Sequence, residues 1–406
     1  MRNQSGFQPD AALAAQFDRF QRLTLLVGGG GLLLSLIVAI FNVDLFLRAY
    51  LVGYLFWLGI SLGSMVWLLI YHLTGGAWGV AIRRILEAAT PLLILMAVLL
   101  LPILVGLPRL YVWAQAAVVA ADQVLQQKQP YLNVGFFIGR ALLYFAIWIG
   151  VALLLNRWSR EQETTGEPAA REEINTRLRQ FSGPGVVAYG LTMTFAAFDW
   201  TMSLEPHWFS SIYGLLLIAG QVLTALAFAI VVLAWVAPRT ALRQVVTEQH
   251  FHDLGNFLLG ATLFWMYIAF CQFLIIWSGN LPEEVVWYLA RLAGGWQWIA
   301  LLILLFHFTL PFAILLSARI KRRREWLVWV AGALLVADLL HLYWLVEPAF
   351  HAGTFFLNPL VLVLPVAIGA LWLYGFLWWF RRRPLLPTQV EDVHAVTFQE
   401  APGDVR

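Results

Sequence analysis

The feature that most constrains the fold of this chain is a series of long apolar runs. About ten of them are long enough to cross roughly 30 Å of hydrocarbon at 1.5 Å of helix rise per residue. Hydrophobic residues make up 61% of the 406 residues and charged residues only 12%, which excludes an ordinary soluble domain. The chain is therefore predicted to be an all-α, polytopic membrane protein. The runs lie near residues 23–41, 50–73, 90–106, 133–155, 183–203, 207–236, 254–278, 295–318, 326–346 and 356–380.

The basic residues indicate how these helices are oriented. If both termini are cytoplasmic, 21 of the 26 Lys and Arg residues lie in cytoplasmic segments and four lie in outer segments, while Arg140 falls inside a helix. An excess of this kind is typical of cytoplasmic loops. The sequence thus predicts ten crossings of the membrane with both termini on the cytoplasmic side.

One charged stretch divides the chain. Residues 156–182 form its only sizeable polar insertion, and their mixed-sign charges predict a solvated cytoplasmic connector that is in part helical, rather than a catalytic element. The connector separates four helices in residues 1–155 from six helices in residues 183–380. Residues 381–406 are predicted to form an extended cytoplasmic tail.

The most unusual local sequence joins the fifth helix to the sixth. The run FDWTMSLEPHWFSSIYG, at residues 198–214, places Asp199, Glu205 and His207 at the outer boundary of the membrane. For Glu205 and His207 two interpretations stay open, a hydrated turn that caps the next helix or a set of proton-carrying groups. Tyr189 shares a helix face with Asp199 and begins a polar stripe leading up to that carboxylate.

Arg140 lies in the fourth helix at a depth close to that of Asp199. A guanidinium inside a membrane helix is costly unless it is paired or hydrated. We therefore expect Arg140 either to form a structural ion pair with Asp199 or to extend its side chain to the outer interface.

Further ionisable residues lie in the eighth and ninth helices. His307 is near mid-membrane, Asp338 and His341 are one helical turn apart, and Glu347 stands where the ninth helix leaves the membrane. Imidazoles and carboxylates exchange protons near neutral pH, so these residues predict a proton path from the interior to the outer surface. The alternative is that Asp338 and His341 form a static pair that locks helix packing.

On the inner side, His252 and Asp253 open the seventh helix. They are candidates for a proton entry point. Acidic residues also cap helix N-termini, and for these two residues the capping interpretation is favoured.

No redox centre is expected in this chain. The single cysteine, Cys271, and the absence of a CxxCH motif argue against iron–sulfur clusters and covalent haem. His307 and His341 are the mid-membrane candidates for haem b, but their estimated depths differ by about two turns. The chain is thus predicted to bind no cofactor and no metal, and its small net charge of +3 does not indicate a nucleic-acid partner.

The 198–214 motif, at the end of a fifth helix in a ten-helix chain, resembles the ActF subunits of alternative complex III. These belong to the NrfD-like family, which includes the polysulfide reductase membrane subunit. The complexes are quinol:electron acceptor oxidoreductases of bacterial respiratory and photosynthetic chains. The resemblance implies two four-helix bundles with flanking helices, in the bacterial cytoplasmic (inner) membrane.

The resemblance also implies partners and a role. The implied partners are a sister NrfD-like quinol-binding membrane subunit, an iron–sulfur protein subunit and multihaem cytochrome c subunits. The resemblance thus places haem c and the iron–sulfur clusters in partner subunits, outside this chain. It also implies that a quinol, such as menaquinol, is the substrate of the complex. The implied role of this subunit is proton translocation and assembly, and quinone binding is a further implied role. Within the motif, the residues to which the resemblance assigns proton translocation are Asp199, Glu205 and His207. From the residues alone, a stand-alone proton-coupled secondary transporter is the alternative.

Overall fold

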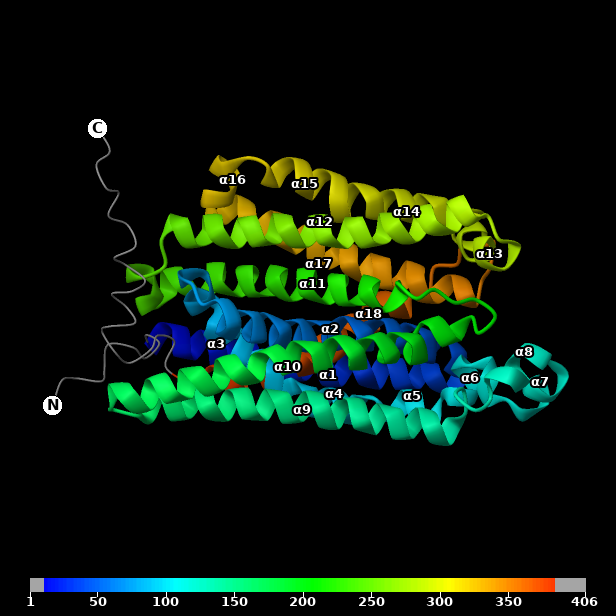
Figure 1. Ribbon diagram of the computed structural model, residues 1–406, viewed down its shortest axis with the longest axis horizontal. Helices are drawn as coiled ribbons and strands as arrows, with labels where there is room; N and C mark the ends of the chain where they lie inside the picture. The colour runs from blue at the N-terminus through cyan, green and yellow to red at the C-terminus, as the bar shows by residue number, and fades with distance from the viewer. Residues whose placement is uncertain (1–10, 384–406) are drawn as a thin grey trace.

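The computed structural model describes residues 11–383, so the rest of the expected tail, residues 384–406, lies outside the described residues. Long helices run side by side along the long axis of the molecule (Figure 1). The helices are α1 (Ala11–Phe41), α2 (Val43–Thr74), α3 (Ala77–Ala89), α4 (Leu93–Leu99), α5 (Leu101–Val105), α6 (Leu107–Leu110), α7 (Ala116–Ala121), α8 (Gln123–Lys128), α9 (Val134–Thr164), α10 (Pro168–Trp200), α11 (Tyr213–Val236), α12 (Glu248–Gly279), α13 (Pro282–Arg291), α14 (Trp296–Ile303), α15 (Leu310–Leu315), α16 (Ala318–Arg322), α17 (Arg324–Val346) and α18 (Leu360–Phe380).

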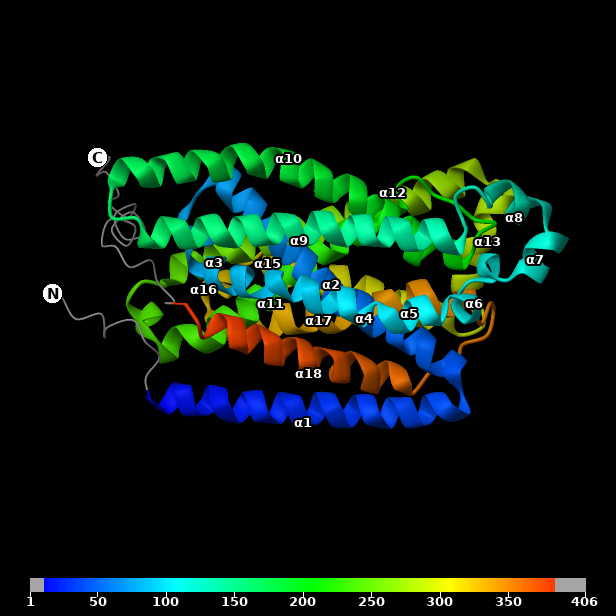
Figure 2. The ribbon, with the colours of Figure 1, turned by 90° about the horizontal axis from the view of Figure 1, so that it is seen from below.

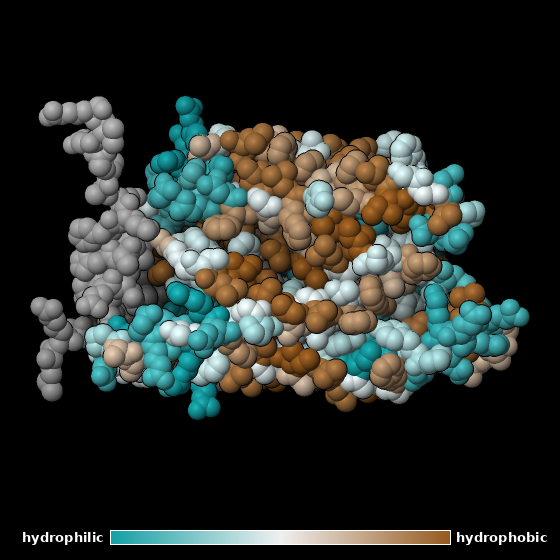
Figure 3. Space-filling view, in the orientation of Figure 1, coloured by the Kyte–Doolittle hydropathy of each residue, from teal (hydrophilic) through white to brown (hydrophobic). Residues whose placement is uncertain are grey.

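Ten helical segments within residues 11–383 are long and apolar enough to cross a membrane, and this part of the chain contains no strand. The prediction of an all-α, polytopic membrane protein is thus confirmed. Apolar side chains form a band between two more polar ends (Figure 3). The start of α1 and the end of α18 lie at the same end of the molecule (Figure 2), as an even number of crossings requires.

Helix α2 forms the centre of the packing. It contacts α10, α11, α17 and α18, and most of its residues are buried. Gly63 permits a close approach of α11, because a β-carbon at this position would lie 2.1 Å from the carbonyl oxygen of Gln221 on α11. Small residues allow membrane helices to approach in this way. The close contact holds Gln221 in the interior of the bundle.

The predicted connector at residues 156–182 is helical in the structure. Helix α9 continues to Thr164 and α10 begins at Pro168, so only a short turn separates the two helices. Ile174 and Leu178 are buried within this stretch. The mixed-sign charges therefore lie on the ends of two packed helices, and the helices before and after them share one core.

Proline interrupts two of the membrane-spanning segments. The third segment breaks into α3, a 3₁₀ turn, α4 and α5 around Pro91 and Pro102. The eighth consists of α14, a π-helical turn at Leu304–Thr309 and α15. Proline offers no N–H to the carbonyl four residues earlier and its ring crowds that carbonyl. For Pro311 that carbonyl belongs to His307, which lies within the widened turn.

The end of the bundle that is predicted to be cytoplasmic contains a buried ionic network. Glu87 on α3 is 3% exposed and accepts hydrogen bonds from Arg83, Arg84, Arg383 and Ser159 at 2.6–3.0 Å. These residues come from α3, α9 and the segment after α18. The network ties the ends of three helices together. It also pairs the buried carboxylate of Glu87 with the guanidinium groups of three arginines.

Candidate functional site

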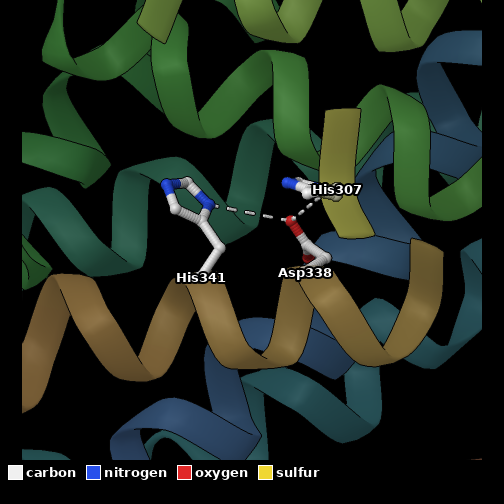
Figure 4. A group of neighbouring side chains, drawn as sticks. All are labelled: His307, Asp338 and His341. Carbon is white, nitrogen blue, oxygen red and sulfur yellow. Dashed lines mark ion pairs between the residues drawn. The ribbon is translucent and has the colours of Figure 1, made fainter. Parts of the chain in front are cut away.

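His307, Asp338 and His341 come together inside the bundle (Figure 4). The Nε2 atom of His307 lies 3.8 Å from Oδ1 of Asp338, and Nδ1 of His341 lies 3.9 Å from the same oxygen. All three residues are buried. We call these three residues the buried cluster.

Two local features of the chain build the buried cluster. Asp338 and His341 are three residues apart on α17, which places both on the same helix face. His307 comes from the π-helical turn before Pro311, and turns of this kind are frequent at functional sites. The Trp265 ring of α12 covers both imidazoles, with ring centroids 4.0 Å from His307 and 5.0 Å from His341.

The polar atoms of the buried cluster are close to one another without being hydrogen-bonded. Neither nitrogen of His307 has a hydrogen-bond partner among the described residues. Separations of 3.8 and 3.9 Å exceed the range of a hydrogen bond, but a side-chain movement of about 1 Å would close either of them. Leaving a buried imidazole unpaired costs free energy, so the arrangement suits groups that exchange partners better than a static packing pair.

A small cavity adjoins the buried cluster. Its volume is about 20 Å³, and Asp338, His341 and Gln221 line it. A space of this size, with three polar side chains in its wall, accommodates one water molecule. Gly220 contributes by its lack of a side chain, since a β-carbon there would lie 3.1 Å from Oδ1 of Asp338.

Beyond this cavity the polar groups continue to α10. The hydroxyl of Tyr189 donates a hydrogen bond of 2.6 Å to Oε1 of Gln221. Tyr189, Gln221, the cavity and Asp338 thus follow one another across α10, α11 and α17. Gln221 was not identified from the sequence, although an amide within an otherwise apolar helix was a signal that could have marked it.

A larger pocket lies on the other side of His341. It has a volume of about 270 Å³ and is lined by α11, α12, α13, α14 and α17. Its wall is mostly apolar and includes the rings of Trp265, Trp287 and Trp344, with the amide of Gln272 and His341 as polar groups. The ring nitrogen of His341 that does not face Asp338 points away from the cluster (Figure 4). We call this space the lateral pocket.

Asp199 and Arg140 form an ion pair apart from the buried cluster. Two guanidinium nitrogens of Arg140 donate to the two carboxylate oxygens of Asp199 at 2.7 and 2.9 Å, and the Tyr144 hydroxyl donates to the same carboxylate at 2.8 Å. The guanidinium also lies over the rings of Tyr131 and Phe136. With its charge met by three donors, Asp199 connects α10 to α9, and no hydrogen bond or ion pair among the described residues links it to His307 or Asp338.

Glu205 and His207 are also engaged in separate contacts at the outer end. Arg291 of α13 is fully buried and donates to both carboxylate oxygens of Glu205. His207 is exposed and lies 2.7 Å from Asp122. Partial burial of Asp122 opposes its ionisation, but the Leu125 N–H and His207 hold the pKa of Asp122 below its ordinary value. The 198–214 motif thus connects the short outer helices.

The beginning of α12 differs from the predicted cap. The helix is capped by Thr247, whose hydroxyl and backbone N–H both pair with His250, so the cap lies before His252 and Asp253. Asp253 accepts a hydrogen bond of 2.8 Å from Gln249 and lies 3.6 Å from His252. The capping interpretation of these two residues is wrong because the helix begins about one turn earlier than expected.

The depth estimate for the two mid-membrane histidines is also wrong. The ring centroids of His307 and His341 are only 5.7 Å apart, because the π-helical turn and the packing of α14 against α17 bring them to the same level. Their ligand atoms and that of Asp338 lie within 4.8 Å of one another, which is wider than the roughly 3.3 Å separations of a tetrahedral zinc site. That the chain binds no haem or metal stays a prediction.

Comparison with known proteins adds no family assignment. No protein-family model matches the chain, and no curated protein is significantly similar to it.

Proposed function

We propose that this protein is a membrane subunit that conducts protons through the buried cluster. The observation that carries the proposal is the position of His307, which is fully buried, has no hydrogen-bond partner among the described residues and lies 3.8 Å from Asp338. Ionisable groups inside membrane helices mark ion or proton pathways because they are costly elsewhere. The water-sized cavity and the Tyr189–Gln221 hydrogen bond extend the polar route away from Asp338.

The setting of this activity is proposed to be a quinol-oxidising complex of the alternative complex III type in a bacterial cytoplasmic membrane. Support comes from the resemblance of the 198–214 motif and from the ion pairs that the motif makes at the outer end. Partner subunits would supply the haem c and iron–sulfur clusters. Purification through an affinity tag on this chain tests this setting, since co-purifying haem c and iron–sulfur subunits are expected. A monodisperse single subunit with ligand-dependent stability would support the secondary transporter instead.

Proton conduction is tested by Asp338→Asn in the reconstituted complex. This change keeps the shape of the side chain and removes its ability to bind and release a proton at neutral pH. We expect a lower ratio of protons moved to electrons transferred, while assembly and haem content stay normal. Asp44→Asn, at a partly exposed outer position, is the matched control. An unchanged ratio in intact Asp338→Asn complex would contradict the proposal.

The lateral pocket supports quinone binding as a second candidate function. A flat ring fits a space walled by indoles, and a quinone oxygen accepts a hydrogen bond from an imidazole or amide such as those of His341 and Gln272. Ala269→Trp would fill the pocket and is expected to abolish quenching of tryptophan fluorescence by a soluble quinone analogue. Val366→Trp, on the exposed face of α18, is the control. Equal quenching in both variants would exclude the pocket as the site.

A further inference from the structure

The outer end of α17 carries a second buried acid, Glu347. It follows His341 by six residues, about 9 Å further along the helix. Its side chain is fully buried, and neither carboxylate oxygen accepts a hydrogen bond from a described residue. A carboxyl group in such surroundings favours its neutral form.

His351 links Glu347 to the solvent. Its Nε2 atom lies 3.6 Å from Oε1 of Glu347, and its side chain is 31% exposed. The ring stacks on Phe356 at a centroid distance of 4.5 Å, and Trp296 donates a hydrogen bond to the His351 carbonyl. The imidazole is thereby held between the buried acid and the outer surface.

The same nitrogen has a second partner. Nη1 of Arg48, on α2, lies 2.9 Å from Nε2 of His351. Arginine only donates hydrogen bonds, so in this arrangement Nε2 accepts and the ring proton is on Nδ1. The nitrogen cannot accept from Arg48 and donate to Glu347 at the same time. Arg48 also lies over the Phe350 ring at 4.3 Å, a cation–π contact that does not involve His351.

We propose that Glu347 and His351 form a proton-transfer site at the outer end of the bundle, with Arg48 as a gating residue. In the transfer the O–H bond of the Glu347 carboxylic acid breaks and an N–H bond forms at Nε2 of His351, displacing Arg48. The imidazolium then loses its Nδ1 proton to water, and Arg48 returns to Nε2 after the ring proton shifts back to Nδ1 through solvent. The inference rests on the proposed function, because a release site acts only if protons reach it.

The surrounding charges favour release. Partial burial and the Arg48 guanidinium hold the pKa of His351 below its ordinary value, so an imidazolium formed here loses its proton readily. The groups that face the Glu347 carboxyl are Arg48 from α2, His351 from the loop after α17 and Tyr343 from α17 itself. Arg291 of α13 is directed elsewhere, towards Glu205 and the carbonyl of Leu345.

Infrared difference spectroscopy of the purified full chain tests the site directly. Between acidic and alkaline pH we expect a carboxylic-acid C=O band that disappears in Glu347→Gln. In His351→Gln the band is expected to persist and to titrate at a different pH, because the exchanging imidazole is gone. Arg109→Gln, in an exposed outer ion pair with Asp44, should leave both features unchanged. A band insensitive to Glu347→Gln would overturn the site.

Proton release by the reconstituted complex gives the functional readout. Glu347→Gln and His351→Ala are each expected to slow release by about 100-fold or more, the lower end of the range for loss of a positioned proton donor. Added imidazole should restore release in His351→Ala, an effect that a merely structural residue would not show. This variant also decides the matter if Glu347→Gln fails to assemble.

The outcomes separate the two proposals. Normal release in Glu347→Gln, or in His351→Ala without imidazole, while Asp338→Asn is impaired, overturns this inference and leaves the proposed function intact. A wild-type complex that moves no protons overturns both.

Discussion

His307 has the least satisfied polar side chain of the buried cluster. Its two ring nitrogens lack hydrogen-bond partners among the described residues, while Trp265 covers one face of the ring. By contrast, each oxygen of the Asp199 carboxylate accepts a hydrogen bond from Arg140. The contrast separates two kinds of buried ionisable group in this protein, those locked in place by hydrogen bonds and those without a hydrogen-bond partner among the described residues.

The stability contributed by a locked ion pair is tested at Arg140, the partner of Asp199. Arg140→Met leaves the Asp199 carboxylate buried without its guanidinium partner, and breaking a buried ion pair in this way costs about 3–5 kcal/mol. We expect a clear loss of thermal stability in detergent, measured by unfolding of the purified chain. The control is Arg177→Met, which removes an exposed pair with Glu173 and should cost about 0–1 kcal/mol. Equal losses in the two variants would show that the Arg140–Asp199 pair does not contribute as described.

The stability of the outer end is expected to depend on pH through His351. Partial burial and Arg48 lower the pKa of His351 in the folded protein, so the folded state binds a proton less readily than the unfolded state. The resulting stabilisation is fully present above about pH 6.5, the unfolded value, and is lost as the pH falls through the lower folded pKa. Thermal unfolding between about pH 5 and pH 8 should show this decline, and His351→Gln should reduce it. Identical pH profiles for the two proteins would contradict the assignment.

At the scale of the helix, the π-helical turn at Leu304–Thr309 decides where His307 lies. The turn adjoins α15, whose second residue is Pro311. A regular α-helix through this region would rotate His307 relative to Asp338, because each residue turns the helix by about 100°. The sequence shows the proline but not the widened turn, which also depends on packing against α17.

Replacing Pro311 tests this role of the turn. Pro311→Ala restores an N–H that can bond to the carbonyl of His307, so the turn should revert towards an α-helix. We expect a longer His307–Asp338 separation in a structure of the variant and slower proton movement, with stability unchanged or increased. Pro102→Ala, in a segment without cluster residues, is the matched control. Proton movement at the wild-type rate would show that the turn does not position His307.

At the scale of the whole molecule, the arrangement predicts sidedness. The turn between α9 and α10 and the turn between α10 and α11 lie at opposite ends of the long helix α10. Together with the excess of basic residues near the first of these turns, this places Gly166 in the cytoplasm and Ser211 outside. Both positions are exposed, whereas Ser159 is buried against Glu87 and unsuited to labelling.

Cysteine labelling tests this topology. In a Cys271→Ala background, Gly166→Cys should react with a membrane-impermeant reagent only from the cytoplasmic side, and Ser211→Cys only from the outer side. In intact cells the reagent reaches only the outer side of the membrane, and in inverted vesicles it reaches only the cytoplasmic side. Labelling of both cysteines from the same side would refute the predicted orientation.

The sequence by itself determined the number of membrane-spanning segments and their helical class. Runs of apolar residues in a chain so poor in charge have few alternatives to membrane-spanning helices, since every backbone polar group must be satisfied within the segment. The same reasoning identified Asp338 and His341, because ionisable residues stand out against an apolar background. It also proposed Asp199 as a partner for Arg140 from their similar depth.

Only the tertiary structure decided which polar groups meet. Gln221 joins the site because Gly63 brings α11 close to α2, and His307 reaches Asp338 because a π-helical turn changes its direction. Residues 156–182 form the end of α9 and the beginning of α10, because apolar residues such as Ile174 and Leu178 are buried in the helix packing. The sequence supplies the position of a residue along a regular helix, and it misplaced the depth of His307 because a π-helical turn interrupts that helix. Rotation about the helix axis and the choice of neighbour follow from packing, which joins residues far apart in the chain.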